Sequence, residues 1–394
     1  MWSRVQQSVQ SLFGEDPPDE TWGDLNKPQR EDLPDRLVKL RPRRTNPGVK
    51  RGPDLAKHLH GYKSGKWPFS NASDESSFEL WYEDGELEII FAPGGQSSTD
   101  RFQRSIETLY SRTATRPSNR VWPSIPENYY LRGATTSFEE KFFLPIARVQ
   151  ELKTDPLDTI GNAIAVDALE ATHGIIDGSE ARFVFQLMLK PASDVWAKRP
   201  PFGIDMESVA ETYKNKKYKG GASRLFGDKS GNIDPSADDI RIARVLKDQF
   251  GQPGFYIKIR LVAATPDPTA TSNYFRRVEN ALTALDNPYS QQSISAEIQK
   301  ESRLGKLIHN MIARDMGLSL TDRMGERKMM ATTDELASIL HLPTDGNITA
   351  IDWATMDQGY GVPEDLPGFW DVVDDTEFES AMKQDLLELT GVNP

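Results

Sequence analysis

The sequence predicts an α+β fold, in which a mostly antiparallel sheet is covered by helices. Two runs rich in β-branched and aromatic residues flank Asp84-Gly85 in "FELWYEDGELEIIFAP", which is a strong signal for a hairpin. Later strand-like runs alternate with amphipathic helical segments, and none is followed by the turn of a parallel nucleotide-binding sheet. The order of these elements also allows two ferredoxin-like halves.

The other elements follow from local patterns. Strands are expected in "ENYYLRG", "EEKFFLPIA" and "GFYIKIRLVAAT", and "ARFVFQLMLKP" is so apolar that it belongs at the centre of a sheet. The spacing of apolar residues predicts helices at 99–113, 155–170, 236–250, 268–286, 299–316 and 333–341.

Composition restricts the class of protein. The chain has 394 residues, of which 37% are hydrophobic and 27% charged, and it contains no cysteine. Disulfides and thiolate metal sites are therefore excluded, and a reducing or thiol-poor compartment is indicated. No apolar run approaches the roughly 20 residues that span a bilayer, and no signal peptide is visible. We expect a cytoplasmic protein, and the acidic excess fits a halophilic host, although 21 lysines weaken that signal.

The pattern of prolines and charges divides the chain into parts. We expect an amphipathic helix at 1–13, a Pro-rich, disordered basic arm at 14–76, an α+β domain at 77–345 with a surface insertion near 192–233, and an acidic tail at 346–394. The first helix either contacts a membrane surface peripherally or folds back onto its own domain. Its polar face carries a single cation, which favours the second alternative.

Charge is distributed unevenly between the ends of the chain. Residues 27–66 hold 12 Lys and Arg against 4 Asp and Glu, a net charge of +8. Residues 357–394 hold 10 acidic residues against one lysine, a net charge of −9. The two ends are therefore expected to serve different partners.

The basic arm is a candidate nucleic-acid-binding segment. Cations release counterions from a phosphate backbone whatever its base sequence, and nearby aromatic residues, here Tyr62 and Trp67, stack on exposed bases. The alternative is a solvated tail that binds nothing, or one that docks on an acidic partner. The candidate residues are Arg41, Arg43, Arg44, Lys50, Arg51 and Lys57.

Enzymatic motifs are missing from the sequence. The stretches "GYKSGKW" and "GDKSGN" lack the spacing of a phosphate-cradling loop, so ATP hydrolysis by this chain alone is not expected. There is no nucleophile elbow and no cofactor motif. His58 and His60 would lie on one face of a strand, but no third ligand is near them in sequence, so we expect no metal site.

One catalytic alternative is a magnesium-dependent nuclease. Glu139 and Lys141 match an acid-x-Lys pattern, with Glu127 upstream as a further metal-binding acid. Glu151 and Lys153 satisfy the same pattern, which shows how unspecific it is. A solvated strand edge is the favoured interpretation.

The segment "TTDELASILHLP" carries a capping box formed by Thr332 and Glu335, and its helix should end before Pro343. An apolar face follows the box. That face packs either against the chain's own core, which is the usual arrangement, or against a partner ATPase. Its residues are Leu336, Ile339, Leu340 and Leu342.

Several stretches resemble the N-terminal, non-ATPase domain of TraG/HerA-like conjugative DNA-transfer ATPases of the type IV secretion class. They are "FFLPIARVQELKTDPLDTIGNAIAVD", "ARFVFQLMLKPASDVW", "FYIKIRLVAATPDPTATSNYFRRVENAL" and "TTDELASILHLP", and the resemblance covers about residues 78–345. In that family the domain precedes a motor that assembles into a hexameric ring and moves DNA. Here no motor follows Pro343, so the resemblance implies a separate motor subunit or a relative without one. No catalytic residue is carried over.

These observations support three hypotheses. The leading one is a non-catalytic accessory protein that docks on a Walker-type ATPase of a mobile element and contacts DNA non-specifically. The second is the nuclease, and the third is a structural or virion interaction protein. Self-association is left open by the sequence.

Overall fold

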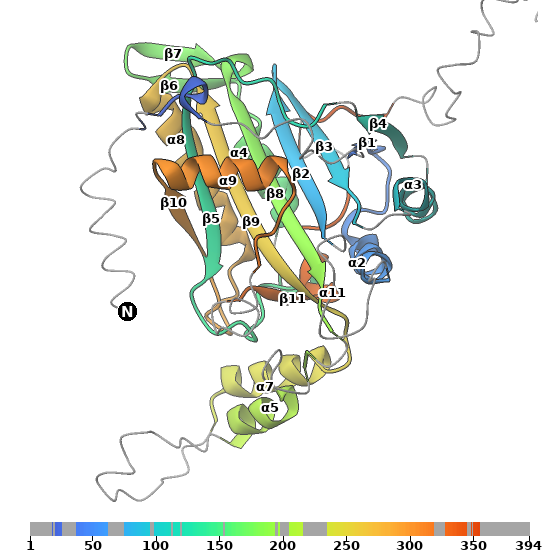
Figure 1. Cartoon of the computed structure of the whole chain (residues 1–394). Helices are drawn as coiled ribbons and strands as arrows, with labels where there is room; N and C mark the ends of the chain where they lie inside the picture. Colours follow the sequence, from blue (N-terminus) through green and yellow to red (C-terminus); the bar gives the residue numbers. More distant parts are fainter. Residues whose placement is uncertain are drawn as a thin grey trace, which may run out of the picture. The chain divides into compact units, whose positions relative to one another are not determined.

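A nine-stranded sheet, in which every pair of neighbouring strands is antiparallel, organises the molecule (Figure 1). Its strand order is β10-β5-β9-β8-β2-β3-β1-β4, and β11 pairs additionally with β9. Helices cover it, so the predicted α+β class is confirmed.

The computed structural model describes the greater part of one compact unit that ends at Ala354. The described residues are 18, 20–25, 37–61, 75–94, 98–111, 113–118, 120–152, 154–193, 196–197, 205–215, 235–318, 328–344, 348 and 350–354. The predicted helix at 1–13 and the tail from 355 onward lie outside them. Within the described residues, no helix is both long enough and apolar enough to cross a bilayer.

The first half of the sheet is a βαββαβ unit. Its elements are β1 (Leu37–Arg41), α2 (Gly52–His60), β2 (Ser76–Glu83), β3 (Glu86–Ala92), α3 (Ser98–Leu109) and β4 (Ala114–Ser118). The strands lie in the order β4-β1-β3-β2. This connectivity and order are those of a ferredoxin-like fold.

The second half repeats the arrangement. Its elements are β5 (Tyr130–Phe138), α4 (Pro156–Ile164), β8 (Arg182–Pro191), β9 (Gly254–Thr265), α8 (Pro268–Ala281) and β10 (Ile294–Gln299). Their order, β10-β5-β9-β8, matches that of the first half strand for strand. The halves join where β2 pairs antiparallel with β8, so the two ferredoxin-like units form one continuous sheet. A pseudo-two-fold axis at this joint relates one unit to the other.

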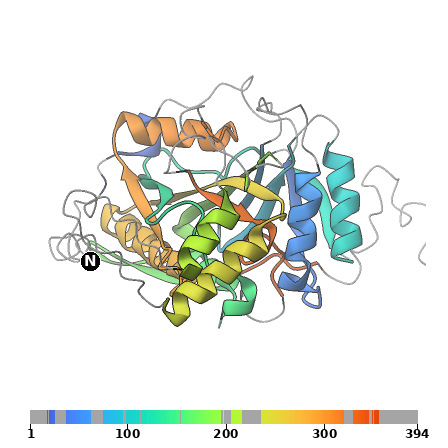
Figure 2. The ribbon, with the colours of Figure 1, turned by 90° about the horizontal axis from the view of Figure 1, so that it is seen from below.

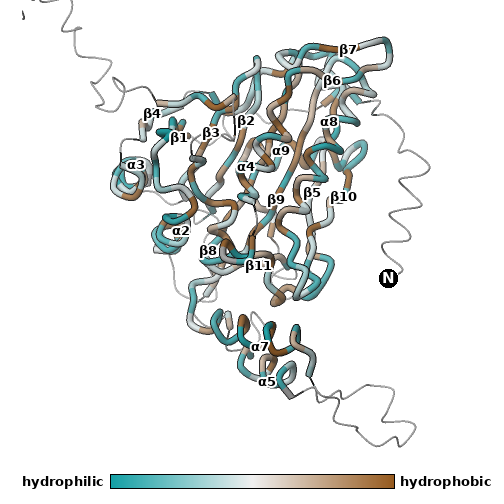
Figure 3. The backbone as a smooth tube through the Cα atoms, turned by 180° about the vertical axis from the view of Figure 1, so that it is seen from behind, coloured by the Kyte–Doolittle hydropathy of each residue, from teal (hydrophilic) through white to brown (hydrophobic). Residues whose placement is uncertain are grey.

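Helices from both halves cover the same face of the sheet. Figure 1 shows α4 and α8 behind it, and Figure 2 shows α2 and α3 side by side. Side chains from these four helices join alternate residues of the strands in the largest core cluster. All ten residues of β8 are buried, as its apolar sequence predicts for a central strand, and hydrophobic colour concentrates along the central strands in Figure 3.

The opposite face is covered by helix α9 (Ser302–Ile312), by the short helix η1 (Trp22–Asp24) and by the loop that contains Trp122 and Ile125. Leu304, Leu307 and other residues of α9 pack there on Trp81, Val184 and Val262. This face also carries polar residues of the central strands, which meet the C-terminal end of α9.

Several segments lie outside the two repeated βαββαβ units. The predicted insertion contains α5 (Met206–Asn215), which pairs with α7 (Ala237–Gln249) between β8 and β9. The pair is anchored by a third apolar cluster that includes Met188 and Tyr256. A small hairpin, β6 (Ala168–Ala171) and β7 (Gly174–Asp177), precedes β8. The remaining elements are the short helices η3 (Gly48–Arg51), η5 (Val149–Glu151), η6 (Gly178–Glu180) and η7 (Leu282–Leu285), followed by β11 (Met330–Thr332) and α11 (Thr333–Leu336).

Three expectations about boundaries are corrected. The predicted disordered arm at 14–76 includes β1 and α2, because Leu37, Val38 and Leu40 of β1 and Leu55, Ala56 and Leu59 of α2 are buried in the core. At the other end, Ile348 and Ile351 are also buried, so the domain continues to Ala354 rather than ending at 345. The predicted helix at 333–341 is regular only through α11.

The predicted strand "EEKFFLPIA" is a loop. The side chain of Gln292 accepts from the backbone N–H of Glu140 and donates to the carbonyl oxygens of Lys141 and Leu144, at 3.0–3.1 Å. Backbone groups that a ladder would have paired are therefore satisfied by one amide.

The β2–β3 hairpin turns at Asp84 and Gly85, whose φ angles are 53° and 81°. Both central residues thus have positive φ, as the Asp-Gly signal predicts for a type I′ turn. Gly85→Ala is expected to lower the free energy of unfolding by about 1–2 kcal/mol, because a Cβ disfavours this conformation. Gly305→Ala, in α9, is the matched control and should be neutral or stabilising by up to about 1 kcal/mol in a urea titration. Equal effects of the two changes would contradict the turn assignment.

Candidate nucleic-acid interface

The predicted nucleic-acid-binding residues lie on β1, on the loop after it, and on α2. Arg41 belongs to the sheet, where its guanidinium is 2.5 Å from Asp352 Oδ2. The other five lie on the loop and on the outer side of α2. They are Arg43, which is half-buried, and the exposed Arg44, Lys50, Arg51 and Lys57. Five of the six predicted cations therefore lie on two adjoining segments, the loop after β1 and α2.

The loop that carries these cations has a defined conformation. Asn46 is buried, and its Nδ2 donates to the carbonyl oxygen of Pro343 at 2.6 Å while its Oδ1 accepts from the N–H of Gly48 at 2.7 Å. Gly48 has a φ of 55°, and a Cβ there would meet the Thr344 side chain at 2.4 Å. The loop is thus held against the C-terminal part of the domain, and its cations are presented from a rigid base.

Helix α3 adds two cations that the sequence did not associate with the others. Arg101 and Arg104 are exposed on α3, which packs beside α2. Contact between the helices is made by His58, whose Nε2 lies within hydrogen-bonding distance of Ser105 Oγ. Burial, and secondarily the positive charge of Arg101, lower the pKa of His58, which places Arg101 close to α2. We call the surface formed by Arg43, Arg44, Lys50, Arg51, Lys57, Arg101 and Arg104 the basic platform.

The balance of charge on the platform is positive. Residues 37–61 contain seven Lys and Arg but one acidic residue, Asp54, which lies 2.9 Å from Arg51. Helix α3 contributes two arginines, together with Asp100 and Glu107. Arg44 lies over the ring of Trp353, 5.6 Å from its centroid. A surface of exposed cations on a rigid base suits contacts with phosphates, which need charge but little shape.

The nuclease pattern is not assembled. Glu127 precedes β5 and Glu139 follows it, so a nine-residue strand separates the two carboxylates. At about 3.3 Å per residue, such a strand spans roughly 30 Å, far beyond the reach of one metal ion. Glu139 instead accepts from Ser293 Oγ at 2.8 Å, and the Nζ of Lys141 lies 5.8 Å from the centroid of the Phe143 ring. Lys153 lies outside the described residues.

No cluster of three or more metal-binding side chains occurs among the residues that the structure describes. His58 and His60 lie on α2 rather than on a strand, so residues two apart point in different directions. His58 contacts Ser105, whereas the ring of His60 packs edge-on against Phe255 with centroids 5.3 Å apart. The strand on which these histidines could have paired is therefore a helix, and the two rings have separate partners.

The apolar face proposed for a partner ATPase is internal. All four predicted residues have side chains that are 0% exposed and belong to the largest core cluster. These residues are Leu336, Ile339, Leu340 and Leu342. Of the two arrangements left open by the sequence, packing against the chain's own core is the one observed. The partner-binding role of these four residues is thereby corrected.

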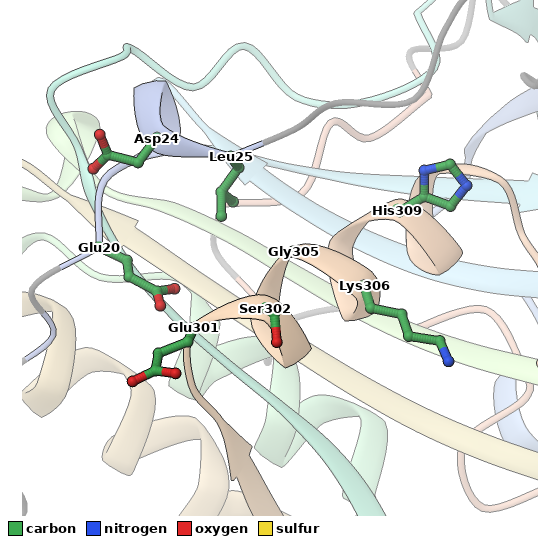
Figure 4. Close-up of a pocket in the computed structure, with 8 residues that line it drawn as sticks. All are labelled: Glu20, Asp24, Leu25, Glu301, Ser302, Gly305, Lys306 and His309. Atoms are coloured by element: carbon green, nitrogen blue, oxygen red, sulfur yellow. The ribbon is translucent and has the colours of Figure 1, made fainter.

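A shallow depression of about 480 Å³ lies between η1 and the beginning of α9. Its polar lining includes Glu20, Asp24 and Glu301, and Figure 4 shows Lys306 pointing away from these carboxylates. Glu301 has a φ of 52° immediately before α9. No convergent set of catalytic groups is formed there by the described residues.

Comparison with known proteins gives a family. The family described as "Domain of unknown function (DUF8128)" matches residues 20–354. The chain belongs to the DUF8128 family. The matched range ends at the same residue as the compact unit, Ala354, and it includes β1, α2 and the platform loop. A search of curated proteins gave no match.

Proposed function

We propose that this DUF8128 protein is a non-catalytic accessory subunit of a DNA-translocating, Walker-type ATPase, and that its basic platform contacts DNA non-specifically. The observation that carries the DNA-binding part is that exposed cations occur on the β1–α2 loop, on α2 and on α3, which packs beside α2. The resemblance to TraG/HerA-like N-terminal domains supports the association with a motor. The motor would supply the ATP hydrolysis.

Phosphate contact fits the platform better than base recognition does. Its side chains are long, flexible cations on the outer surface of packed helices, and each cation that neutralises a phosphate releases counterions. Sequence readout instead requires a helix or strand inserted in a groove with several polar side chains directed at base edges. We therefore expect the platform to contact the phosphate backbone of the nucleic acid, without sequence preference.

The test is DNA binding by two variants with equal changes of charge. The triple variant Lys50→Gln, Lys57→Gln, Arg104→Gln removes three cations from the platform. The control, Lys300→Gln, Arg303→Gln, Lys306→Gln, removes three exposed cations at and before α9, on the opposite face of the sheet. Affinity for a fluorescent 30-base-pair duplex is measured by anisotropy over a range of salt concentrations.

The platform variant should bind at least about tenfold more weakly, and the slope of log K against log salt should fall by up to about 2.7, or 0.9 for each lost contact. The control should bind like the unchanged protein. Equal weakening by both variants would show that net charge alone governs binding and would refute the platform. The motor part is tested separately, by mixing the purified chain with a Walker-type ATPase encoded beside it and measuring complex formation and ATP turnover.

A further inference from the structure

A partly exposed tryptophan lies beside the basic platform. Trp353 is half-buried and packs on one side against the largest core cluster, while the guanidinium of Arg44, a platform residue, lies over its ring. The other tryptophans in the described part of the chain are at most 8% exposed: Trp22, Trp81, Trp122 and Trp196. Because tryptophan is highly buried on average, a ring left partly exposed among cations is a candidate binding group.

Backbone hydrogen bonds hold Trp353 in place. The N–H of Leu87, on β3, donates to the carbonyl oxygen of Ala350 at 2.8 Å. The N–H of Ala354 donates to the carbonyl oxygen of Pro42 at 3.0 Å. The residues before and after Trp353 are therefore fixed to the first half of the sheet and to the platform loop, so the ring is presented at a defined position.

The charges around the ring favour an anionic ligand. Asp352 precedes the tryptophan, and its Oδ2 lies 3.1 Å from Lys39 Nζ and 2.5 Å from the guanidinium of Arg41. Glu88 also pairs with Lys39, at 2.7 Å. These two carboxylates and two cations balance one another, and the exposed Arg44 adds a net positive charge beside the ring.

An aromatic ring next to a phosphate-binding cation suits a nucleic acid with unpaired bases. A base stacks on a side chain only if one of its faces is free, and the bases of a duplex are already stacked on their neighbours. The sequence suggested Tyr62 and Trp67 for such stacking, but both lie outside the described residues. Trp353 supplies an aromatic ring at the platform itself.

We propose that Trp353 stacks on an unpaired base while Arg44 contacts a phosphate of the same strand, so that the platform binds single-stranded DNA more tightly than duplex DNA. This inference rests on the DNA-binding role proposed above and specifies the form of DNA. Every base has a face that can stack, so the site has no sequence requirement.

The test compares the affinity of the full chain for a fluorescent single-stranded oligonucleotide with its affinity for the same strand in a duplex, by anisotropy at one salt concentration. In Trp353→Ala the preference for the single strand should fall about fivefold or more, because loss of one aromatic–base stack has at least this effect. Phe250→Ala is the matched control, since it removes an aromatic side chain that is 43% exposed at the end of α7. It should keep the preference of the unchanged protein.

Tryptophan fluorescence tests the stack directly, even if Trp353→Ala fails to fold. Trp353→Phe keeps an aromatic ring and should keep most of the preference for the single strand. Addition of the single strand should quench the fluorescence of the unchanged protein more than that of Trp353→Phe, because a stacked base quenches the indole. Equal quenching of the two proteins, or an unaltered preference in folded Trp353→Ala, would overturn the proposal.

Failure of the stacking can be told apart from failure of the DNA-binding role. If the triple variant Lys50→Gln, Lys57→Gln, Arg104→Gln weakens binding to both forms of DNA while Trp353→Ala leaves the preference unaltered, only the stacking is refuted. If the unchanged protein binds neither form, the DNA-binding role is refuted and the stacking with it.

Discussion

Arg314→Met is expected to lower the free energy of unfolding by about 3–5 kcal/mol, because it leaves a buried carboxylate without its cation. Glu79 is 0% exposed at the centre of β2, and both nitrogens Nε and Nη2 of Arg314 lie 3.1 Å from its oxygens. Ser77, Trp81 and Gln186 donate to the same carboxylate. None of them carries the charge that the arginine supplies.

The same arginine also holds the end of α9. Its Nη1 donates to the carbonyl oxygen of Ile312 at 2.6 Å, and the nearby Arg260 donates to Asn310 and Asp315. Cations at a helix C-terminus pair with carbonyl oxygens that have no partner within the helix. Loss of Arg314 should therefore loosen α9 on the sheet as well as destabilise Glu79.

Urea denaturation followed by circular dichroism checks this prediction. The double variant Glu79→Gln, Arg314→Met should regain part of the loss, since no buried charge is then left unpaired. Lys247→Met is the control, because Lys247 and Glu211 form an exposed ion pair with side chains 45% and 42% accessible. A denaturation midpoint unaffected by Arg314→Met would show that the pair is not part of the stable core.

Features that depend on neighbouring residues in the chain were predictable. The Asp84-Gly85 turn, the central position of β8 and the Thr332–Glu335 capping box are all confirmed. Each requires only a dihedral preference, a run of apolar residues or a contact three residues away. The sequence could not show that Glu335 would also bind Ile146 and Gln249, because those contacts depend on tertiary structure.

Strand β1 and helix α2 were missed because their sequence signals are weak. β1 has five residues, and the loop between it and α2 contains Pro42, Pro47 and Gly48, a composition typical of disorder. The apolar spacing of Leu55, Ala56 and Leu59 was the available signal for α2. Once β1 and α2 are included, the two halves have the same order of elements, whereas no repeat is visible in the sequence itself.

The candidate interface was predictable only where its residues are neighbours in the sequence. The cations from Arg43 to Lys57 are close in sequence, so a charge count finds them. Arg101 and Arg104 join the platform only because α3 packs beside α2. Conversely, Glu127 and Glu139 are twelve residues apart in sequence, and the strand between them keeps them far apart in space.

Leu340→Ala is expected to lower the free energy of unfolding by about 2–5 kcal/mol, because it leaves a cavity in the core between the two halves. Leu340 is 0% exposed and belongs to the same core cluster as Leu55 of α2 and Leu157 of α4. A partner-binding leucine on a free surface would instead tolerate alanine with little change in stability.

The control for this change is Ile175→Ala, on the small hairpin, where the side chain is 74% exposed. It should leave the urea midpoint unchanged, whereas Leu340→Ala should shift it strongly. If Leu340→Ala instead kept full stability and weakened only binding to the proposed ATPase partner, Leu340 would be a docking residue rather than a core residue. The two halves would then be held together chiefly by the β2–β8 pair, and the joint between them would be open to a partner.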